Sequence, residues 1–320
     1  MKTYIADFRL NEPVETVLMV AEKRLVPFRD QAKGRYLAVV LVDRTGQIEG
    51  RAWENAEALA EGLEPGDVVR VAGVVEEYRE NRQLRLTALE RLAEGQADLA
   101  DFLPVSPRDR QEMAVRLDAL VASVREPHLA GLLRSFFGDP AFRQAYCEAP
   151  AAKRVHHNYL GGLLEHSLEV AELVETVAAF GPGFHRDLAV TGALLHDIGK
   201  VREYRLRPLI DLTDEGKLLG HTTLGWEMLR QRIAQSEGFP PELAVHLEHL
   251  ILAHHGELEW GAPVQPQTVE AAALHYADLL SGRVKQYQQV AAAGSGTPAP
   301  AAAWSPYDSL LGRSLYLGGR

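Results

Sequence analysis

The sequence contains almost no cysteine. Cys147 is the single cysteine among 320 residues, so the chain cannot close an internal disulfide and offers no thiolate set for a structural zinc site. One thiol is compatible with a reducing compartment. The N-terminal residues lack an apolar stretch, and no segment approaches the roughly 18 consecutive apolar residues of a membrane span. We therefore expect a soluble, cytoplasmic protein without membrane contact.

Positive charge is also scarce. Lysine and arginine number 34 against 44 aspartate and glutamate residues, which gives a formal net charge of −10. Proteins that coat nucleic acid through electrostatics carry the opposite balance. Any contact with nucleic acid must then be local, through a groove or a metal site. The chain length and an apolar fraction of 46% are sufficient for two domains with a substantial core.

Short runs rich in valine, leucine and aromatic residues dominate the first part of the chain, and turn residues separate them. These runs cover residues 36–43, 47–53, 67–78 and 83–92, with one brief helical insert at 55–63. Four or five short strands of this kind predict a small β-barrel, of which the OB-fold is the commonest plan. An SH3-like barrel without a ligand is the alternative.

Helical periodicity replaces this pattern in the second part of the chain. The pairs Glu126-Pro127 and Asp139-Pro140 are typical of helix starts, whereas the Asp-Glu-Gly turn within residues 205–221 predicts a small hairpin. The domain boundaries that we expect are an OB-fold nucleic-acid-binding domain over 1–95, a linker over 96–107, a helical domain over 108–292, and a linker with a C-terminal tail over 293–320.

Histidines gather in the helical part, since none of the 12 precedes His128. Several stand at expected helix ends or beside glycine, where side chains can converge on a cavity. The ordered series, with two aspartates, is His166, His196, Asp197, His221, His254, His255 and Asp278. Imidazole and carboxylate without thiolate suit Mn²⁺, Fe²⁺, Zn²⁺ or Mg²⁺. The series exceeds the needs of one ion and suits two ions that share a carboxylate, an arrangement used for phosphoryl hydrolysis.

Each of these residues alone has an ordinary structural explanation. A lone His166 on an amphipathic helix is more often a satisfied core or surface residue. His196 and Asp197 could be a helix C-terminal pair favoured by the dipole at the histidine, and His254 with His255 could belong to an ordinary turn. The metal prediction therefore depends on the whole series.

The order of the series resembles that of the HD phosphohydrolase superfamily in its two-metal form. The segments VHHNYLGGLLEHSLEV, GALLHDIGKVREY, GKLLGHTTLG, HLILAHHGELEWGAPVQP and ALHYADLL are similar to the HD domain of the YhaM-type 3′→5′ exoribonucleases. The segment GRYLAVVLVDRTGQIEGRAW resembles the OB domain that precedes HD in that family. The resemblance implies a multidomain protein, with an N-terminal all-β OB barrel followed by an all-α HD helical bundle.

The resemblance also implies a ligand set for two divalent ions. One ion would lie on His166, His196, Asp197 and Asp278, and the other on Asp197, His221, His254 and His255. Mn²⁺ is the expected metal, with Fe²⁺, Co²⁺, Zn²⁺ and Mg²⁺ as alternatives. Where we expect an acidic residue and then a lysine after the last aspartate, this chain has Ser281 and Arg283, which leaves the substrate contacts in that stretch open.

The expected reaction is hydrolysis of single-stranded RNA, or also of single-stranded DNA, from its 3′ end to nucleoside 5′-monophosphates by a metal-activated hydroxide. Asp197 would bridge the ions, and Lys200 would meet charge on the phosphoryl group. His157 would hold a phosphate or donate a proton to the leaving oxygen. Solvation of Lys200 and a structural role for His157 are the alternatives. The oligomeric state, including a homo-oligomer, is left open.

The barrel would hold the strand by base stacking and a narrow cationic groove. The candidate contacts are Lys33, Arg35, Tyr36, Arg44, Trp53 and Tyr78, with Arg51 and Arg82 as further cations. Tyr36 and Trp53 alternate with apolar residues, so core positions are the alternative for both. Two other functions stay open, namely a phosphodiesterase of cyclic or small nucleotides and a nucleic-acid-binding protein with a vestigial metal site.

Overall fold

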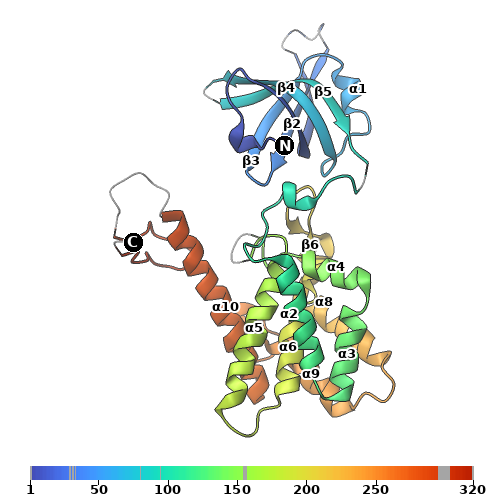
Figure 1. Ribbon diagram of the computed structural model, residues 1–320, viewed down its shortest axis with the longest axis vertical. Coiled ribbons are helices and arrows are strands. Elements are labelled where there is room, and N and C mark those ends of the chain that lie inside the picture. Colours follow the sequence, from blue (N-terminus) through green and yellow to red (C-terminus); the bar gives the residue numbers. More distant parts are fainter. Residues whose placement is uncertain are drawn as a thin grey trace. The chain divides into compact units, whose positions relative to one another are not determined.

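A computed structural model describes residues 2–28, 30, 32, 34–79, 81–93, 95–153, 157–294 and 303–318. The chain divides into two compact units, one drawn from residues 1–105 and 205–211 and the other from residues 106–204 and 212–320. Figure 1 shows a β-barrel in the first unit and a helical bundle in the second. Among the described residues, no helix combines the length and apolar character that crossing a membrane requires.

Five strands close the barrel of the first unit. They are β1 (Pro13–Pro27), β2 (Arg35–Asp43), β3 (Gly46–Ala52), β4 (Val68–Tyr78) and β5 (Asn81–Arg91), with the helix α1 (Ala56–Ala60) and the 3₁₀ turns η1 (Ile5–Asp7) and η3 (Leu99–Asp101). The strand order is β1-β2-β3-β5-β4, closed by pairing of β4 with β1, and only β3 and β5 pair in parallel. Alternate residues of β2, such as Leu37, Val39 and Leu41, fill the interior. The predicted OB barrel is confirmed.

The longest strand, β1, is absent from the strand runs that the sequence predicts. Its middle residues Ala21, Glu22 and Lys23 all favour helices over strands. A bulge between Val20 and Glu22 also interrupts the period of two. Pairing with β2 along one edge and with β4 along the other overrides these local preferences.

Helices form the second unit, as the sequence predicts. They are α2 (Arg110–Ser123), α3 (Pro127–Phe137), α4 (Pro140–Glu148), α5 (Gly162–Val177), α6 (Arg186–Leu195), α7 (Lys200–Glu203), α8 (Asp214–Ala234), α9 (Pro241–Ala253) and α10 (Val269–Gly294), with the 3₁₀ turns η4 (Ala178–Phe180) and η5 (Leu258–Trp260). The helix α6 contacts α3, α5, α9 and α10. Every residue from Leu188 to Leu195 is buried, which explains why α6 has no polar face.

Two of these helices begin at the predicted acid-proline pairs. Glu126 Oε2 accepts a hydrogen bond from the backbone N–H of Leu129 at 2.6 Å at the start of α3. Asp139 Oδ1 accepts from the N–H groups of Ala141 and Phe142 at the start of α4. The acidic side chain satisfies N–H groups that have no partner within the helix. Both predicted starts are confirmed.

A small hairpin does lie within residues 204–212, but the Asp-Glu-Gly turn is not part of it. Strand β6 (Tyr204–Arg205) pairs with β7 (Asp211–Leu212). The Asp-Glu-Gly residues instead open α8, where Thr213 Oγ1 accepts from the N–H of Gly216 at 2.8 Å. The turn prediction was wrong because a short polar tripeptide behind a capping threonine also suits the first turn of a helix.

Residues 303–318, hereafter the C-terminal segment, fold back on themselves. Trp304 bridges to Tyr316, and Asp308 bridges to Arg313. The rings of Trp304 and Tyr316 lie 5.2 Å apart between centroids. By the contacts of its backbone, this segment belongs to the helical unit.

Candidate metal centre

The buried helix α6 determines where His196 and Asp197 point. These two residues follow its last residue directly, and they are 0% and 2% exposed. The chain then turns sharply, because the N–H of Lys200 donates to the carbonyl of Asp197 at 3.0 Å. A buried helix on one side and a tight turn on the other thus hold the pair in the interior of the bundle.

A first donor set surrounds Nε2 of His166, which α5 contributes. This atom is 3.0 Å from Oδ1 of Asp278 on α10 and 3.3 Å from Nε2 of His196. Asp197 Oδ2 lies 3.3 Å from His196 Nε2 and 3.6 Å from His166 Nε2. Residues that are far apart in the sequence thereby present four donor atoms to one small region.

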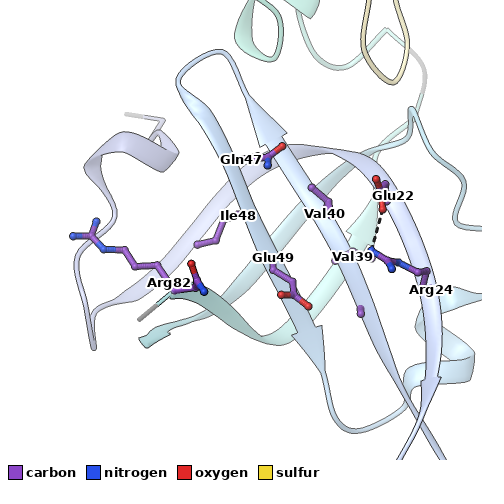
Figure 2. A pocket seen from close by; sticks show the side chains of 10 residues that line it. Glu22, Arg24, Val39, Val40, Gln47, Ile48, Glu49 and Arg82 are labelled. Atoms are coloured by element: carbon purple, nitrogen blue, oxygen red, sulfur yellow. Dashed lines mark hydrogen bonds and ion pairs between the residues drawn. The ribbon is translucent and has the colours of Figure 1, made fainter. Parts of the chain in front are cut away.

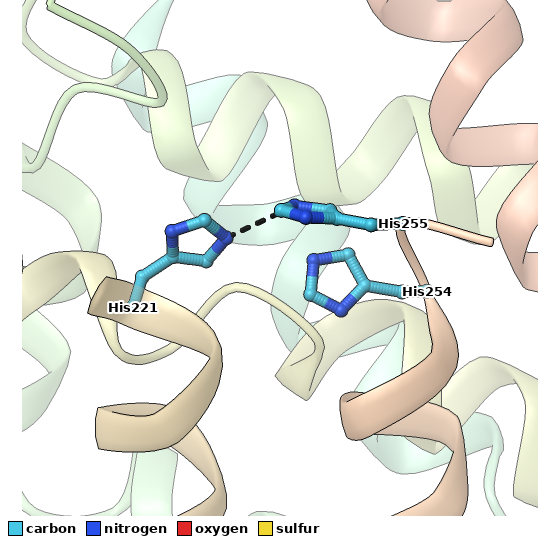
Figure 3. Close-up of side chains that lie close together, drawn as sticks. All are labelled: His221, His254 and His255. Atoms are coloured by element: carbon cyan, nitrogen blue, oxygen red, sulfur yellow. Dashed lines mark hydrogen bonds between the residues drawn. The ribbon is translucent and has the colours of Figure 1, made fainter. Parts of the chain in front are cut away.

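A second donor set consists of three histidines, whose rings face one another in Figure 3. His221 Nε2 is 3.2 Å from His255 Nε2 and 3.4 Å from Asp197 Oδ1. His254 Nε2 is 3.7 Å from the same oxygen. His221 follows the kink of α8 at Gly220, and the other two rings follow the end of α9.

The carboxylate of Asp197 therefore faces both donor sets, with Oδ2 toward the first and Oδ1 toward the second. Asp197 Oδ1 and His254 Nε2 are buried, and neither has a hydrogen-bond partner among the described residues. Burial of such atoms without partners is unfavourable. The donor sets thus fit divalent cations, which would satisfy both atoms, and all seven predicted metal ligands lie in this centre.

The five histidines of the centre share one orientation, in which Nδ1 faces a hydrogen-bond acceptor. The acceptors are Ser281 Oγ for His166 at 3.0 Å, the Ala193 carbonyl for His196 at 2.8 Å, Glu203 Oε1 for His221 at 3.1 Å, the Ile251 carbonyl for His254 at 2.6 Å and the Trp260 carbonyl for His255 at 3.1 Å. Each contact favours a proton on Nδ1, which leaves the lone pair of Nε2 directed into the centre. A second hydrogen bond of this kind is typical of metal-ligating histidines.

A buried acidic network supports the first donor set from behind. Ser281 Oγ accepts from His166 and donates to Glu169 Oε2 at 2.6 Å. Burial acts to raise the pKa of Glu169, but hydrogen bonds from His157 and Ser281 lower it to about 2. The carboxylate of Glu165, paired with Lys285, lies beside it. His166 is thus connected through one hydroxyl to a carboxylate that stays ionised.

Two glycines allow the close packing that brings the donor sets together. A side chain at Gly199 would overlap the backbone oxygen of His221, because α8 passes directly over this residue. A side chain at Gly256, where φ is +80°, would overlap the ring of His275. Gly256 directly follows the His-His pair and Gly199 stands two residues after Asp197, so both glycines lie at the points of closest packing beside the donor sets.

The charges of the centre follow from burial and from neighbouring groups. Burial acts to raise the pKa of Asp197, but Lys200 and His196 hold that pKa well below its usual range. The pKa of Asp278 is likewise lowered, chiefly by His166, although burial opposes the shift. Burial and the neighbouring His255 hold the pKa of His254 well below its usual range. Burial acts to lower the pKa of His196, but Asp197 raises it overall. Ionised carboxylates and a neutral imidazole, such as that of His254, are the forms that bind metal ions.

The two other predicted catalytic residues occupy different places. Lys200 Nζ donates to Asp197 Oδ2 at 2.6 Å and lines a cavity next to the donor sets. His157 is fully buried behind His166, and its Nε2 lies 3.3 Å from Glu169 Oε2. It does not line the cavity. The location of His157 favours a structural role over contact with a phosphate or leaving group.

His246 and His249 lie on α9, outside both donor sets. The side chain of His246 is exposed. His249 Nε2 accepts a hydrogen bond from the N–H of Gln267 at 2.9 Å.

On the barrel, Tyr36 and Trp53 lie side by side, with ring centroids 4.7 Å apart. Phe28 is 5.4 Å from Tyr36 and 5.9 Å from Trp53. The guanidinium of Arg51 lies within 5.9 Å of the rings of Tyr36, Trp53 and Tyr78. We call these five residues the aromatic patch. Trp53 and Tyr78 are 38% and 47% exposed, and Tyr36 is not part of the barrel core, so the patch offers ring faces to solvent.

Of the other predicted contacts that the structure describes, Arg44 lies away from the aromatic patch. Arg44 follows the opposite end of β2 from Tyr36, and its guanidinium lies 4.5 Å above the ring of Tyr4. Arg35 is exposed at the first position of β2. Lys33 lies outside the described residues. The patch is therefore smaller than the set that the sequence predicts, and Phe28 is an unpredicted member of it.

A separate depression of about 340 Å³ lies over β1, β2, β3 and the start of β5, and Figure 2 shows the side chains that line it. Arg24 and Arg82 line it together with Glu22 and Glu49. Arg24 pairs with Glu22 at 3.1 Å, and no aromatic side chain is among its described lining residues. A nucleic-acid backbone there would meet two carboxylates and no stacking surface, which makes the aromatic patch the better candidate.

Sequence reasoning missed the side chains that orient the ligands. The sequence pattern does not single out Glu203 or Glu169, and Ser281 stands out only as a departure from a family pattern. Glu169 stands three residues after His166 on α5, so helical spacing was an available signal. No comparable signal existed for Glu203, because its contact with His221 depends on how α7 packs against α8.

A closed OB barrel followed by a helical bundle with a buried centre of histidine and aspartate defines a two-domain phosphohydrolase of the HD type. Residues 163–283 match the family model described as HD domain, and residues 17–92 match that described as OB-fold nucleic acid binding domain. An HD domain implies dependence on divalent metal ions, for which the two donor sets supply ligands.

The relatives narrow this class. The chain is 30% identical over 282 residues to the 3′-5′ exoribonuclease YhaM of Geobacillus sp. (strain WCH70), covering 88% of this chain and 85% of that protein. It is 32% identical over 250 residues to the 3′-5′ exoribonuclease YhaM of Bacillus subtilis (strain 168), covering 78% and 79%. The chain belongs to the YhaM 3′-5′ exoribonuclease family. The second OB-fold domain of replication protein A from Methanococcus maripaludis is a distant likeness, with 20% identity, a TM-score of 0.25 and coverage of 30% of this chain and all of that chain.

Proposed function

We propose that this chain is a metal-dependent 3′→5′ exoribonuclease that releases nucleoside 5′-monophosphates from single-stranded RNA. Membership of the YhaM family supports the activity. The observation that carries the proposal is the carboxylate of Asp197, which directs one oxygen to each donor set. Asp197 would bridge two cations, and the further proposed ligands are His166, His196 and Asp278 for one and His221, His254 and His255 for the other.

Mn²⁺ is the proposed metal, because imidazole and carboxylate ligands without thiolate suit it, as they suit Fe²⁺, Co²⁺ and Zn²⁺. Cations held in this way activate water and polarise phosphoryl oxygens. The ammonium group of Lys200, beside Asp197 at the cavity wall, would stabilise negative charge that develops on those oxygens. The aromatic patch would hold unpaired bases of the strand by stacking. We also propose a cytoplasmic location, which the single thiol fits.

The activity is tested by incubating the purified full chain and Mn²⁺ with single-stranded RNA that is labelled at the 5′ end or at the 3′ end. The expected result is a ladder from the 5′-labelled strand and early release of labelled monophosphate from the 3′-labelled strand. Intact RNA together with hydrolysis of a cyclic nucleotide would show a small-molecule phosphodiesterase instead. A parallel reaction with single-stranded DNA measures the preference between the two polymers.

A further inference from the structure

A cavity of about 360 Å³ opens beside the metal centre. Asp197, His255 and Asp278 line one part of it, together with Lys200. This volume is near the lower end of the roughly 300–1,000 Å³ range of small-molecule sites. The cavity therefore suits one small anionic ligand in reach of the donor sets, rather than a folded or double-stranded polymer.

The other part of the cavity is apolar and includes Trp260, an aromatic side chain that the metal centre leaves available. The backbone of Trp260 is fixed, because its carbonyl accepts from His255 Nδ1 at 3.1 Å. Its side chain is 52% exposed. The indole also lies 6.0 Å from the ring of His275, which is another lining residue. An exposed indole on a backbone that is held beside the metal centre offers a stacking surface.

Two further apolar groups line the same cavity. Leu279 comes from α10, one residue after the ligand Asp278. Leu310 comes from the C-terminal segment and is 64% exposed. The cavity thus combines apolar groups that could contact a nucleobase with a metal centre that could contact a phosphate.

Arg283 supplies a cation on the same side of α10. It stands four residues after Leu279, which is one helical turn, and both line the cavity. Its side chain is exposed, and among the residues that the structure describes its guanidinium donates one long hydrogen bond, from Nη1 to Gln286 Oε1 at 3.3 Å. A guanidinium with donors to spare suits the oxygens of a phosphate.

From these observations we infer that the cavity is the site of the 3′-terminal nucleotide, in which Trp260 stacks on the base and Arg283 contacts the phosphate. The inference rests on the proposed function for the identity of the polymer, but it concerns binding of one nucleotide. Stacking does not read the edge of a base, so all four nucleoside 5′-monophosphates should bind. Trp260 is then a residue that sets affinity for the terminal base.

The test is calorimetric binding of adenosine 5′-monophosphate and of ribose 5-phosphate to the full chain loaded with Mn²⁺. The wild-type chain should bind the nucleotide roughly 5- to 100-fold more tightly than the sugar phosphate, because only the nucleotide has a base to stack. Trp260→Ala should remove most of this ratio, and Trp260→Phe should keep most of it. The matched control is Phe180→Ala, since Phe180 is an exposed aromatic residue of the same unit that does not line the cavity. Arg283→Ala should weaken both ligands by the same factor.

An unchanged ratio in Trp260→Ala would overturn the stacking role, and unchanged affinities in Arg283→Ala would overturn the phosphate contact. Manganese stoichiometry, measured by electron paramagnetic resonance, should be the same in all of these variants, because the carbonyl that holds His255 belongs to the backbone. The outcome is separable from the proposed function. If the chain binds the nucleotide through Trp260 but leaves RNA intact, the nucleotide site is supported and the proposed exoribonuclease activity is refuted.

Discussion

The metal centre and the aromatic patch differ in how strongly their residues depend on one another. The proposed ligands of the centre come from five different helices or helix ends, and their donor atoms share partners within 3.0–3.7 Å. The patch joins residues of neighbouring strands whose rings stay partly exposed. Side chains in a shared buried network depend on one another. We therefore expect all-or-none losses in the centre and graded losses in the patch.

The largest expected effect is that of Asp197→Ala. Removal of the carboxylate that faces both donor sets should abolish manganese binding and lower the rate of RNA hydrolysis by more than about 10³-fold. Equilibrium dialysis against Mn²⁺ and an RNA degradation assay would measure both losses. Asp118→Asn is the control, since Asp118 is an exposed partner of Arg143 in the same unit. Turnover at the wild-type rate in Asp197→Ala would refute the bridging role.

Gly199→Ala should rank second, because the new methyl group would push α8 and its His221 away from Asp197. We expect a loss of about 1–3 kcal/mol in the free energy of unfolding, together with weaker metal binding. Gly131→Ala is a matched helical control with open space around its added carbon, and it should stabilise the fold by about 0.5–1 kcal/mol. Chemical denaturation of both variants gives the comparison; equal stabilities would contradict the packing argument.

Ser281→Ala should have an intermediate effect, because it disconnects His166 from Glu169 without removing a ligand. Loss of such a supporting group typically lowers metal affinity by about 10- to 100-fold. A competition titration with a chromogenic chelator would measure this change. The control is Ser135→Ala, because the hydroxyl of Ser135 donates a hydrogen bond to the Leu132 carbonyl of its own helix. Wild-type affinity in Ser281→Ala would mean that His166 is oriented by packing alone.

The smallest effect is expected on the barrel, where Trp53→Ala removes one stacking surface. The KM for a long single-stranded RNA should rise by about 5- to 150-fold, corresponding to one lost base contact of about 1–3 kcal/mol, while kcat stays unchanged. Hydrolysis of a dinucleotide, whose two nucleotides are both needed at the scissile bond, should be unaffected. Arg44→Ala, away from the patch, is the control. A fall in kcat for the dinucleotide would contradict the proposal that the patch affects RNA binding without affecting the reaction at the centre.

The same contrast explains what the sequence could predict. The barrel and the bundle follow from local periodicity and turn residues, except that β1 is obscured by helix-favouring residues and a bulge. The metal-binding residue types follow from an ordered series of histidines and aspartates. Which nitrogen faces the centre does not follow, because Ser281 and Glu203 reach their histidines from other helices. Leu310 at the cavity likewise depends on where the C-terminal segment lies.

The partners of Nδ1 also determine which amino-acid substitutions could alter the centre during evolution. Three of the five acceptors are main-chain carbonyls, and no amino-acid substitution deletes a carbonyl. The orientation of those three histidines is therefore mutationally robust as long as the helices keep their places. Ser281 and Glu203 are the two replaceable supports. A change in the orientation of the histidines, and with it in metal preference, would therefore require a substitution at one of these two positions.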